Sequence, residues 1–148
     1  MTDTQRARTT LQSLFADNTT GEISPQDLRD YLASTKLYAE NRFVALIDGA
    51  VVDIDCTSGN HFHLDAAGDR IIGIPANVSS RMSDKMVLRI KAISADRTIT
   101  MSGVAGGFRF GTEIEALSGV VSGKSDYIGC VYNSGDNKWD IVSYIRGY

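Results

Sequence analysis

The hydrophobic residues near the start of the chain recur at the spacing of a helix. Leu14 and Phe15 follow Leu11 by three and four positions, so the three side chains share one helical face. This helix is predicted to end near Ala16, because the polar run at 17–21 has the Asn, Thr and Gly content of a turn.

A second helix has the clearest start signal in the sequence. Ser24 is a good N-cap, Pro25 suits the first helical position, and Asp27 places a carboxylate in the first turn. Its short apolar stripe consists of Leu28, Tyr31 and Leu32. Helices this short are marginal alone, so we expect both stripes to be buried against each other, the rest of the chain or another chain.

From residue 42 onward the pattern changes to alternating apolar and polar residues with frequent turn signals. This pattern predicts an antiparallel sandwich or barrel, preceded by a helical segment at 1–40, with the β domain at 41–148. No repeat of 20 to 50 residues is visible, which argues against a solenoid or propeller. The predicted strands are 43–47, 51–56, 61–65, 70–74, 86–94, 98–101, 112–117, 126–133 and 138–146.

Composition and charge exclude several classes of protein. The 148 residues carry 15 Lys and Arg against 18 Asp and Glu, so there is no cationic surplus for a nucleic-acid partner. The apolar runs fall far short of the ~18 residues that a membrane span needs, and we expect a soluble protein made in the cytoplasm. Cys56 and Cys130 stand far apart, each in a predicted strand, and are expected to be buried.

The strongest candidate for metal chemistry is the pair His61 and His63, which would share one strand face with Asp65. A β-barrel metal site of the cupin type would need a Glu four or five residues later and a further His, and both are missing. We therefore expect an ordinary polar strand face there. We also expect no calcium site between the two helices, because the loop lacks its first carboxylate and its bidentate Glu.

Two carboxylate pairs and one phosphate-loop-like run have equally plain interpretations. Asp53 with Asp55 and Glu113 with Glu115 flank an isoleucine at i and i+2, which predicts solvated strand faces. The run at 122–125 lacks the glycine spacing and the following helix of a phosphate loop. No catalytic residue, cofactor or metal ligand is predicted.

One stretch of the sequence resembles a known group of proteins. The run at 9–30, TTLQSLFADNTTGEISPQDLRD, resembles a segment of many tailed-bacteriophage virion proteins, including fibre, spike and head-surface proteins. The runs at 49–55, 87–91 and 133–143 are similar to small terminal β domains of such proteins. The resemblance implies a non-enzymatic homotrimeric virion component, with a helical part that attaches or trimerises and a jelly-roll-like knob. A long fibre shaft is missing, which favours a short surface knob or decoration protein.

The two predicted helices are the expected attachment or oligomer contact. The residues we expect to make it are Leu11, Leu14, Phe15, Leu28, Tyr31 and Leu32. The alternative is that these side chains cover an open face of their own sandwich. Further apolar residues that need a second surface, and so suggest oligomer contacts in the β domain, lie at 71–72, 108–110 and 120–121.

A host-surface glycan is the alternative partner. Four aromatic residues near the last hairpin, if exposed, could stack on sugar rings: Tyr127, Tyr132, Trp139 and Tyr144. Aromatic residues at this density are more often core or trimer contacts. An enzyme using a metal at His61 and His63 is the third hypothesis.

Overall fold

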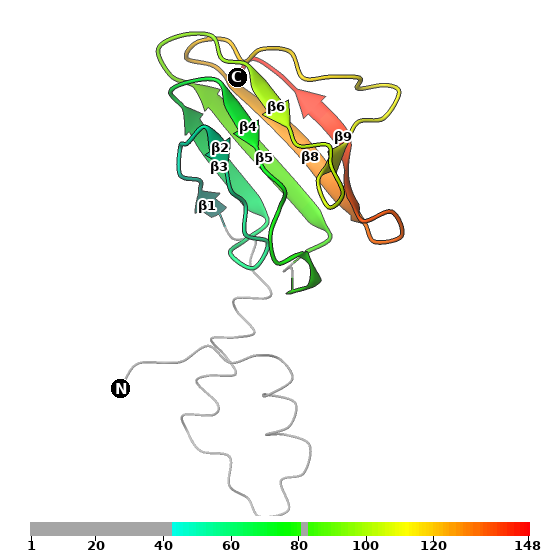
Figure 1. Cartoon of the computed structure of the whole chain (residues 1–148). Coiled ribbons are helices and arrows are strands. Elements are labelled where there is room, and N and C mark those ends of the chain that lie inside the picture. The colour runs from blue at the N-terminus through cyan, green and yellow to red at the C-terminus, as the bar shows by residue number, and fades with distance from the viewer. Residues whose placement is uncertain (1–42, 81–82) are drawn as a thin grey trace, which may run out of the picture. The chain divides into compact units, whose positions relative to one another are not determined.

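The computed structural model describes residues 43–80 and 83–148 (Figure 1). The expected contact residues Leu11, Leu14, Phe15, Leu28, Tyr31 and Leu32 lie outside these ranges, as does the helix-loop-helix, so both stay predictions. The division between 1–40 and 41–148 also stays a prediction.

The described part of the chain is mainly β and forms two sheets. The larger, here sheet A, has the strand order β1-β3-β5-β8-β9-β7, and the smaller, sheet B, has the order β2-β4-β6. The strands are β1 (Phe43–Ala45), β2 (Val51–Val52), β3 (His61–Ala66), β4 (Arg70–Ile72), β5 (Lys85–Ala92), β6 (Ile99–Met101), β7 (Phe108–Arg109), β8 (Ser125–Asn133) and β9 (Lys138–Ile145). A short 3-10 helix, η1, spans Val78–Ser80.

The chain winds between the two sheets instead of folding back beside itself. Its first six strands alternate between sheet A and sheet B, and each pairs in parallel with the strand two places before or after it. Parallel strands cannot be joined by tight hairpins, so each connection crosses to the other sheet. This is the winding of a short parallel β-helix with three turns, although no repeat of constant length marks the turns in the sequence.

The prediction of antiparallel pairing is therefore wrong for most of the domain. Among the described residues five of the seven strand pairs are parallel, and only β5 with β8 and β8 with β9 are antiparallel. The physical reason is that an alternating pattern identifies the buried face of a strand but not its neighbour. The jelly-roll-like topology, which needs antiparallel pairing throughout, is not confirmed.

The last hairpin agrees with its prediction. Strands β8 and β9 are antiparallel and are joined by residues 134–137, where Asn137 has a φ of 52° that Asn tolerates well. A β-bulge between Gly129 and Cys130 shifts the register, so that Gly129 pairs with Ser143 and Cys130 with Ile141.

Three aspartates lie in the connections that lead from a strand of one sheet to a strand of the other, here called corners. Each accepts a hydrogen bond from a backbone amide in the corner one turn later. Asp48 accepts a hydrogen bond from the Ala67 backbone N–H at 3.2 Å, and Asp69 accepts one from the Thr98 N–H at 2.8 Å. Asp96 accepts another from the Ser122 N–H at 2.8 Å. These carboxylates accept hydrogen bonds from corner amides that lie outside the strands. We call the three aspartates the corner ladder, and their role is structural.

Two aspartates of the domain have a lowered pKa because each accepts a hydrogen bond from an arginine. Arg70 donates to Asp48 Oδ2 at 2.8 Å, and this hydrogen bond lowers the pKa of the Asp48 carboxyl below its usual value. At the far side of the domain Arg109 has the same effect on the pKa of Asp140, to which it donates at 2.8 Å.

One predicted strand is absent and one short strand was missed. Residues 112–117 form an irregular segment that pairs with no strand of the described domain. Phe108–Arg109, predicted only as residues near a loop, forms β7 parallel to β9.

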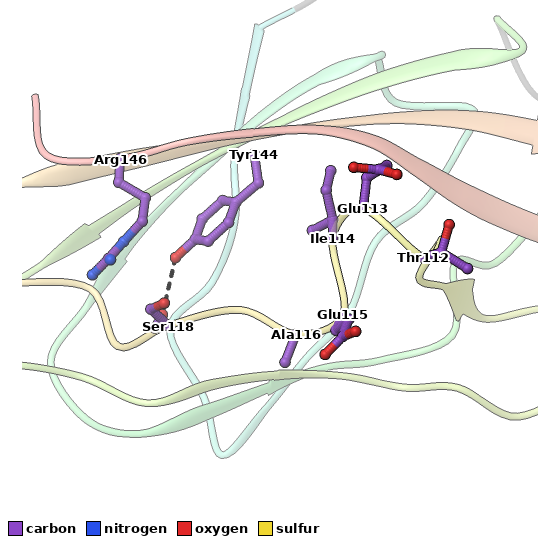
Figure 2. Close-up of a pocket in the computed structure, with 8 residues that line it drawn as sticks. All are labelled: Thr112, Glu113, Ile114, Glu115, Ala116, Ser118, Tyr144 and Arg146. Carbon is purple, nitrogen blue, oxygen red and sulfur yellow. Dashed lines mark hydrogen bonds between the residues drawn. The ribbon is translucent and has the colours of Figure 1, made fainter.

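The core lies between the sheets and is a single cluster. Sheet A contributes Phe62, Leu64, Leu88 and Ile90, and sheet B contributes Val52 and Ile72. Trp139 is its largest fully buried side chain. Sheet B covers only part of sheet A's inner face, and the segment 112–118 passes under β9 (Figure 2).

Candidate functional site

Two regions of the described domain merit attention as functional sites: the outer face of sheet A and a groove beside β9. The outer face is the side of sheet A that points away from sheet B. Strand pairing places its side chains in rows, of which the first is Phe43, His61, Val87, Gly129 and Ser143 and the second is Ala45, His63, Arg89, Tyr127 and Ile145.

The outer face carries exposed hydrophobic side chains among its charged ones. Exposed large hydrophobic side chains occur on four of its strands: Phe43, Val87, Val131, Val142 and Ile145. Val142 is 58% exposed and lies with Ser143 on the outward side of the β-bulge. An antiparallel or mixed sheet with one wet face normally presents polar residues there, so this surface has the character of an interaction site.

Gly129 keeps the centre of the outer face flat. A Cβ atom at this position would overlap Ser143 Oγ, so a larger residue at 129 requires the exposed Ser143 hydroxyl to rotate away.

We predict that Gly129→Ala destabilises the domain by less than about 1 kcal/mol, because the added methyl only forces the exposed Ser143 hydroxyl into another rotamer. In the background of Ser143→Ala, which removes Oγ, the same change should cost almost nothing. Urea unfolding of the four proteins of this double-mutant cycle measures the coupling. If Gly129→Ala changed the free energy of unfolding equally in both backgrounds, the Ser143 hydroxyl would not be what restricts the side chain at position 129.

The histidine pair lies on the outer face, as its strand spacing predicts. His61 and His63 are half-buried beneath the Phe43 ring, with ring centroids 5.2 and 3.9 Å from it, while Phe62 and Leu64 are buried on the opposite side. Asp65 lies 3.6 Å from the Arg89 guanidinium. Among residues 43–80 and 83–148, no three His, Cys, Asp or Glu side chains are grouped to hold a metal ion.

The groove beside β9 has a volume of about 500 Å³ and is open to solvent. Its walls are the segment 112–118 and the end of β9, and it is lined by Thr112, Glu113, Ile114, Glu115, Ala116, Ser118, Tyr144 and Arg146. Figure 2 shows the Glu113 and Glu115 side chains extending away from each other. Two carboxylates that do not converge are poorly arranged for acid–base chemistry on one bond.

Tyr144, which lines this groove, is held in place by a hydrogen bond to Asp126. The Tyr144 hydroxyl lies 2.8 Å from Asp126 Oδ2 and 3.0 Å from the Ser118 carbonyl oxygen, so one hydrogen serves two acceptors. Burial, with the nearby Asp126 carboxylate, raises the pKa of Tyr144 to about 12, which keeps the phenol a donor at neutral pH. The buried Asp126 also accepts from the Gly147 N–H at 3.0 Å, which anchors the end of β9.

The four aromatic residues considered for sugar stacking do not form one exposed platform. Trp139 is buried, and Tyr132 packs against it with ring centroids 5.2 Å apart. Tyr127 lies on the outer face in edge contact with Tyr148, and only Tyr144 lines the groove. Trp139 points into the core, which is the commoner role expected for aromatic residues at this density, so it is not available for sugar stacking.

The structure also tests the expected burial of the two cysteines and the expected exposure of three apolar runs. Cys56 and Cys130 are buried as expected, and burial raises the pKa of Cys130 to about 12. Of the apolar residues expected to need a second surface, Ile71 and Val121 are exposed. Their neighbours Ile72 and Val120 are buried, so these two pairs present apolar side chains to both faces as expected. Phe108 is a core residue and Phe110 packs against the core, and whether the exposed residues contact another copy stays a prediction.

Sequence reasoning missed the residues that make the outer face apolar. Val87, Val131 and Ile145 occupy the outward positions of their strands, where alternation predicts polar side chains. A β-branched hydrophobic residue at a strand position where alternation predicts a polar one was the sequence signal that could have identified the outer face.

The described residues contain no helix long and apolar enough to span a membrane. The chain matches no protein-family model, and no curated protein or solved structure matches it.

Proposed function

We propose that this chain is a non-enzymatic structural protein of a tailed-bacteriophage virion. In this proposal it is an oligomeric surface knob, decoration protein or short fibre, attached through its helical segment at 1–40. The proposal rests on the resemblance of residues 9–30 to virion proteins, and the observation that supports it best is the apolar outer face of sheet A. A surface of that kind needs a protein partner, which an assembled particle supplies.

The assignment of roles within the chain follows from where the β domain obtains its stability. The core is built from residues of the described β domain, and its strands pair with one another. In this proposal the apolar stripes at 11–15 and 28–32 make the attachment or the trimer contact. Their partners in this proposal are other copies of the chain and other virion proteins.

Deleting residues 1–36 is expected to leave a soluble β domain and to abolish its attachment to the particle. The measurement is co-sedimentation of the purified protein with particles of the encoding phage from which the chain is missing. Circular dichroism with thermal unfolding verifies that the truncated domain is folded.

A full-length variant provides the matched control for this deletion. Leu28→Ser combined with Leu32→Ser removes part of one stripe without shortening the chain, and it should reduce particle occupancy severalfold. Wild-type occupancy of the folded truncated protein would disprove attachment through residues 1–36. Failure of the wild-type chain to bind particles would contradict the virion role itself.

A glycan-binding module is the second candidate, and the groove beside β9 is the observation in its favour. Exposed Glu113 and Glu115 offer acceptors for sugar hydroxyls, and Tyr144 offers part of an aromatic ring. A glycan array separates the two functions, because a purely structural decoration protein has no sugar selectivity.

A further inference from the structure

A strip of cationic side chains runs along the outward side of β5, within the outer face of sheet A. It consists of Lys85, Arg89 and Lys91, and we call these three residues the basic strip. The whole chain has a formal net charge of -3, so the chain outside the strip is acidic. Among the outward residues of β1, β3 and β5 as the structure describes them, Asp65 is the one carboxylate. This local excess of positive charge favours an acidic partner.

The charges of the basic strip are only partly compensated within the domain. Arg89 lies 3.6 Å from Asp65, whose side chain is 61% exposed, and a solvated ion pair at that distance contributes little. Neither Lys85 nor Lys91 forms an ion pair with any residue of 43–80 or 83–148. Both ammonium groups are therefore available to the carboxylates of a partner.

Hydrophobic side chains lie directly beside the basic strip. Val87, between Lys85 and Arg89, is 37% exposed, and Val131 of β8, which pairs with Lys85, is equally exposed. Phe43, in the same row as Val87, is 59% exposed. Protein interfaces combine apolar contacts with charged groups in this way. Polysaccharides and single-stranded nucleic acids are held by aromatic ring faces, so they would leave the aliphatic valines without a suitable contact.

The outer face of a second copy is a poor occupant for the basic strip. The Asp140 carboxylate on β9 already accepts hydrogen bonds from the Arg109 guanidinium at 2.8 and 3.0 Å. Lys138 lies on the same outward side of β9 as Asp140. The outer face of another copy therefore has no spare carboxylate to offer the strip, and the occupant that fits is a different protein.

We infer that the basic strip binds an acidic protein surface on the particle, one that presents carboxylates among apolar side chains. The inference rests on the proposed virion role and adds a second contact to the attachment through residues 1–40. The helical segment holds the domain close to the particle in that proposal, so charge pairs that are weak alone still add to the total affinity. The β9 side of the outer face, with the exposed Val142 and Ile145, is left for contacts between copies.

Co-sedimentation of the full-length chain with particles of the encoding phage that lack it tests the basic strip. Lys85→Glu should weaken binding about fivefold or more at low salt, because it opposes a carboxylate to carboxylates. High salt should reduce this difference, since salt screens exposed charges. Lys124→Glu makes the same change at an exposed lysine in the connection before β8, and it should bind as the wild type does. Thermal unfolding verifies that both variants fold.

A second variant separates a protein partner from a polyanion. Val87→Ser should weaken binding about threefold, because it removes apolar contact from the interface. If Lys85→Glu weakened binding and Val87→Ser did not, a polyanion would be the occupant and the inference would be overturned. Heparin and single-stranded DNA, each tested for binding to the wild type and to Lys85→Glu, are the probes that identify such a polyanion.

The remaining outcomes are equally decisive. Particle binding by Lys85→Glu as tight as that by Lys124→Glu would overturn the role of the basic strip. A smaller mass of Lys85→Glu than of the wild type in light scattering would place a second copy on the strip, which also overturns the inference. A wild-type chain that does not bind particles would instead contradict the virion role on which the inference rests.

Discussion

Trp139→Ala is expected to reduce the free energy of unfolding of the β domain by about 3 to 5 kcal/mol. Trp139 is 1% exposed and is the largest fully buried side chain of the described domain. It pairs with Phe108 of β7 and with Tyr132 of β8, so its removal leaves a cavity where three strands meet. Surrounding side chains on a sheet can collapse only partly into such a space. Guanidinium chloride unfolding of the full-length chain measures the loss.

Two control variants separate loss of packing from loss of a hydrogen bond. The indole Nε1 of Trp139 is buried without a hydrogen-bond partner among the described residues, so Trp139→Phe removes a donor that contributes nothing. We expect Trp139→Phe to cost less than about 1.5 kcal/mol. Val104→Ala, on an exposed loop, should change stability by less than about 0.5 kcal/mol. A Trp139→Ala effect as small as that of Val104→Ala would show that Trp139 is not in the core.

Strand positions and buried faces were largely predictable from the sequence. The alternation at His61–Ala66 and Lys85–Ala92 identifies inward residues such as Phe62 and Leu88, and the structure buries them. Alternation is a property of a single strand and carries no information on which strand lies beside it. Parallel winding was therefore missed, and an antiparallel domain was expected in its place.

A faint repeat at the corners could have indicated the winding. Asp69-Arg70 and Asp96-Arg97 each precede a short strand of sheet B, and Asp48 occupies the corner before them. Spacings of 21 and 27 residues between these aspartates hide the repeat, because the connections differ in length. The hydrogen bonds from one corner to the next become visible only in three dimensions.

The candidate site was less predictable than the fold. The expected contact residues were placed on the two helices, at Leu11 and Leu28 among others, and they lie outside the described part of the chain. The outer face of sheet A brings together residues from distant strands, such as Phe43 and Ile145. Each of these is an ordinary exposed hydrophobic residue by itself, and only the strand order shows that they form one surface.

The intact chain is expected to be a trimer in solution. The apolar outer face of sheet A needs cover, and repeated copies of one surface are usually buried by symmetric closure. Dimers are the commonest closed form, and the resemblance of residues 9–30 to phage virion proteins is what favours three copies over two. Association through the outer face should be lost in Val142→Lys, which places a charge at the bulge, but not in Val104→Lys.

Light scattering coupled to size exclusion, on the full-length chain at micromolar concentration, tests the central claim most directly. One chain has a mass of 16.1 kDa, so three copies give about 48 kDa, which is the predicted result. A mass near 16 kDa would contradict the account, and the apolar outer face would then be a surface that the isolated chain leaves exposed to water.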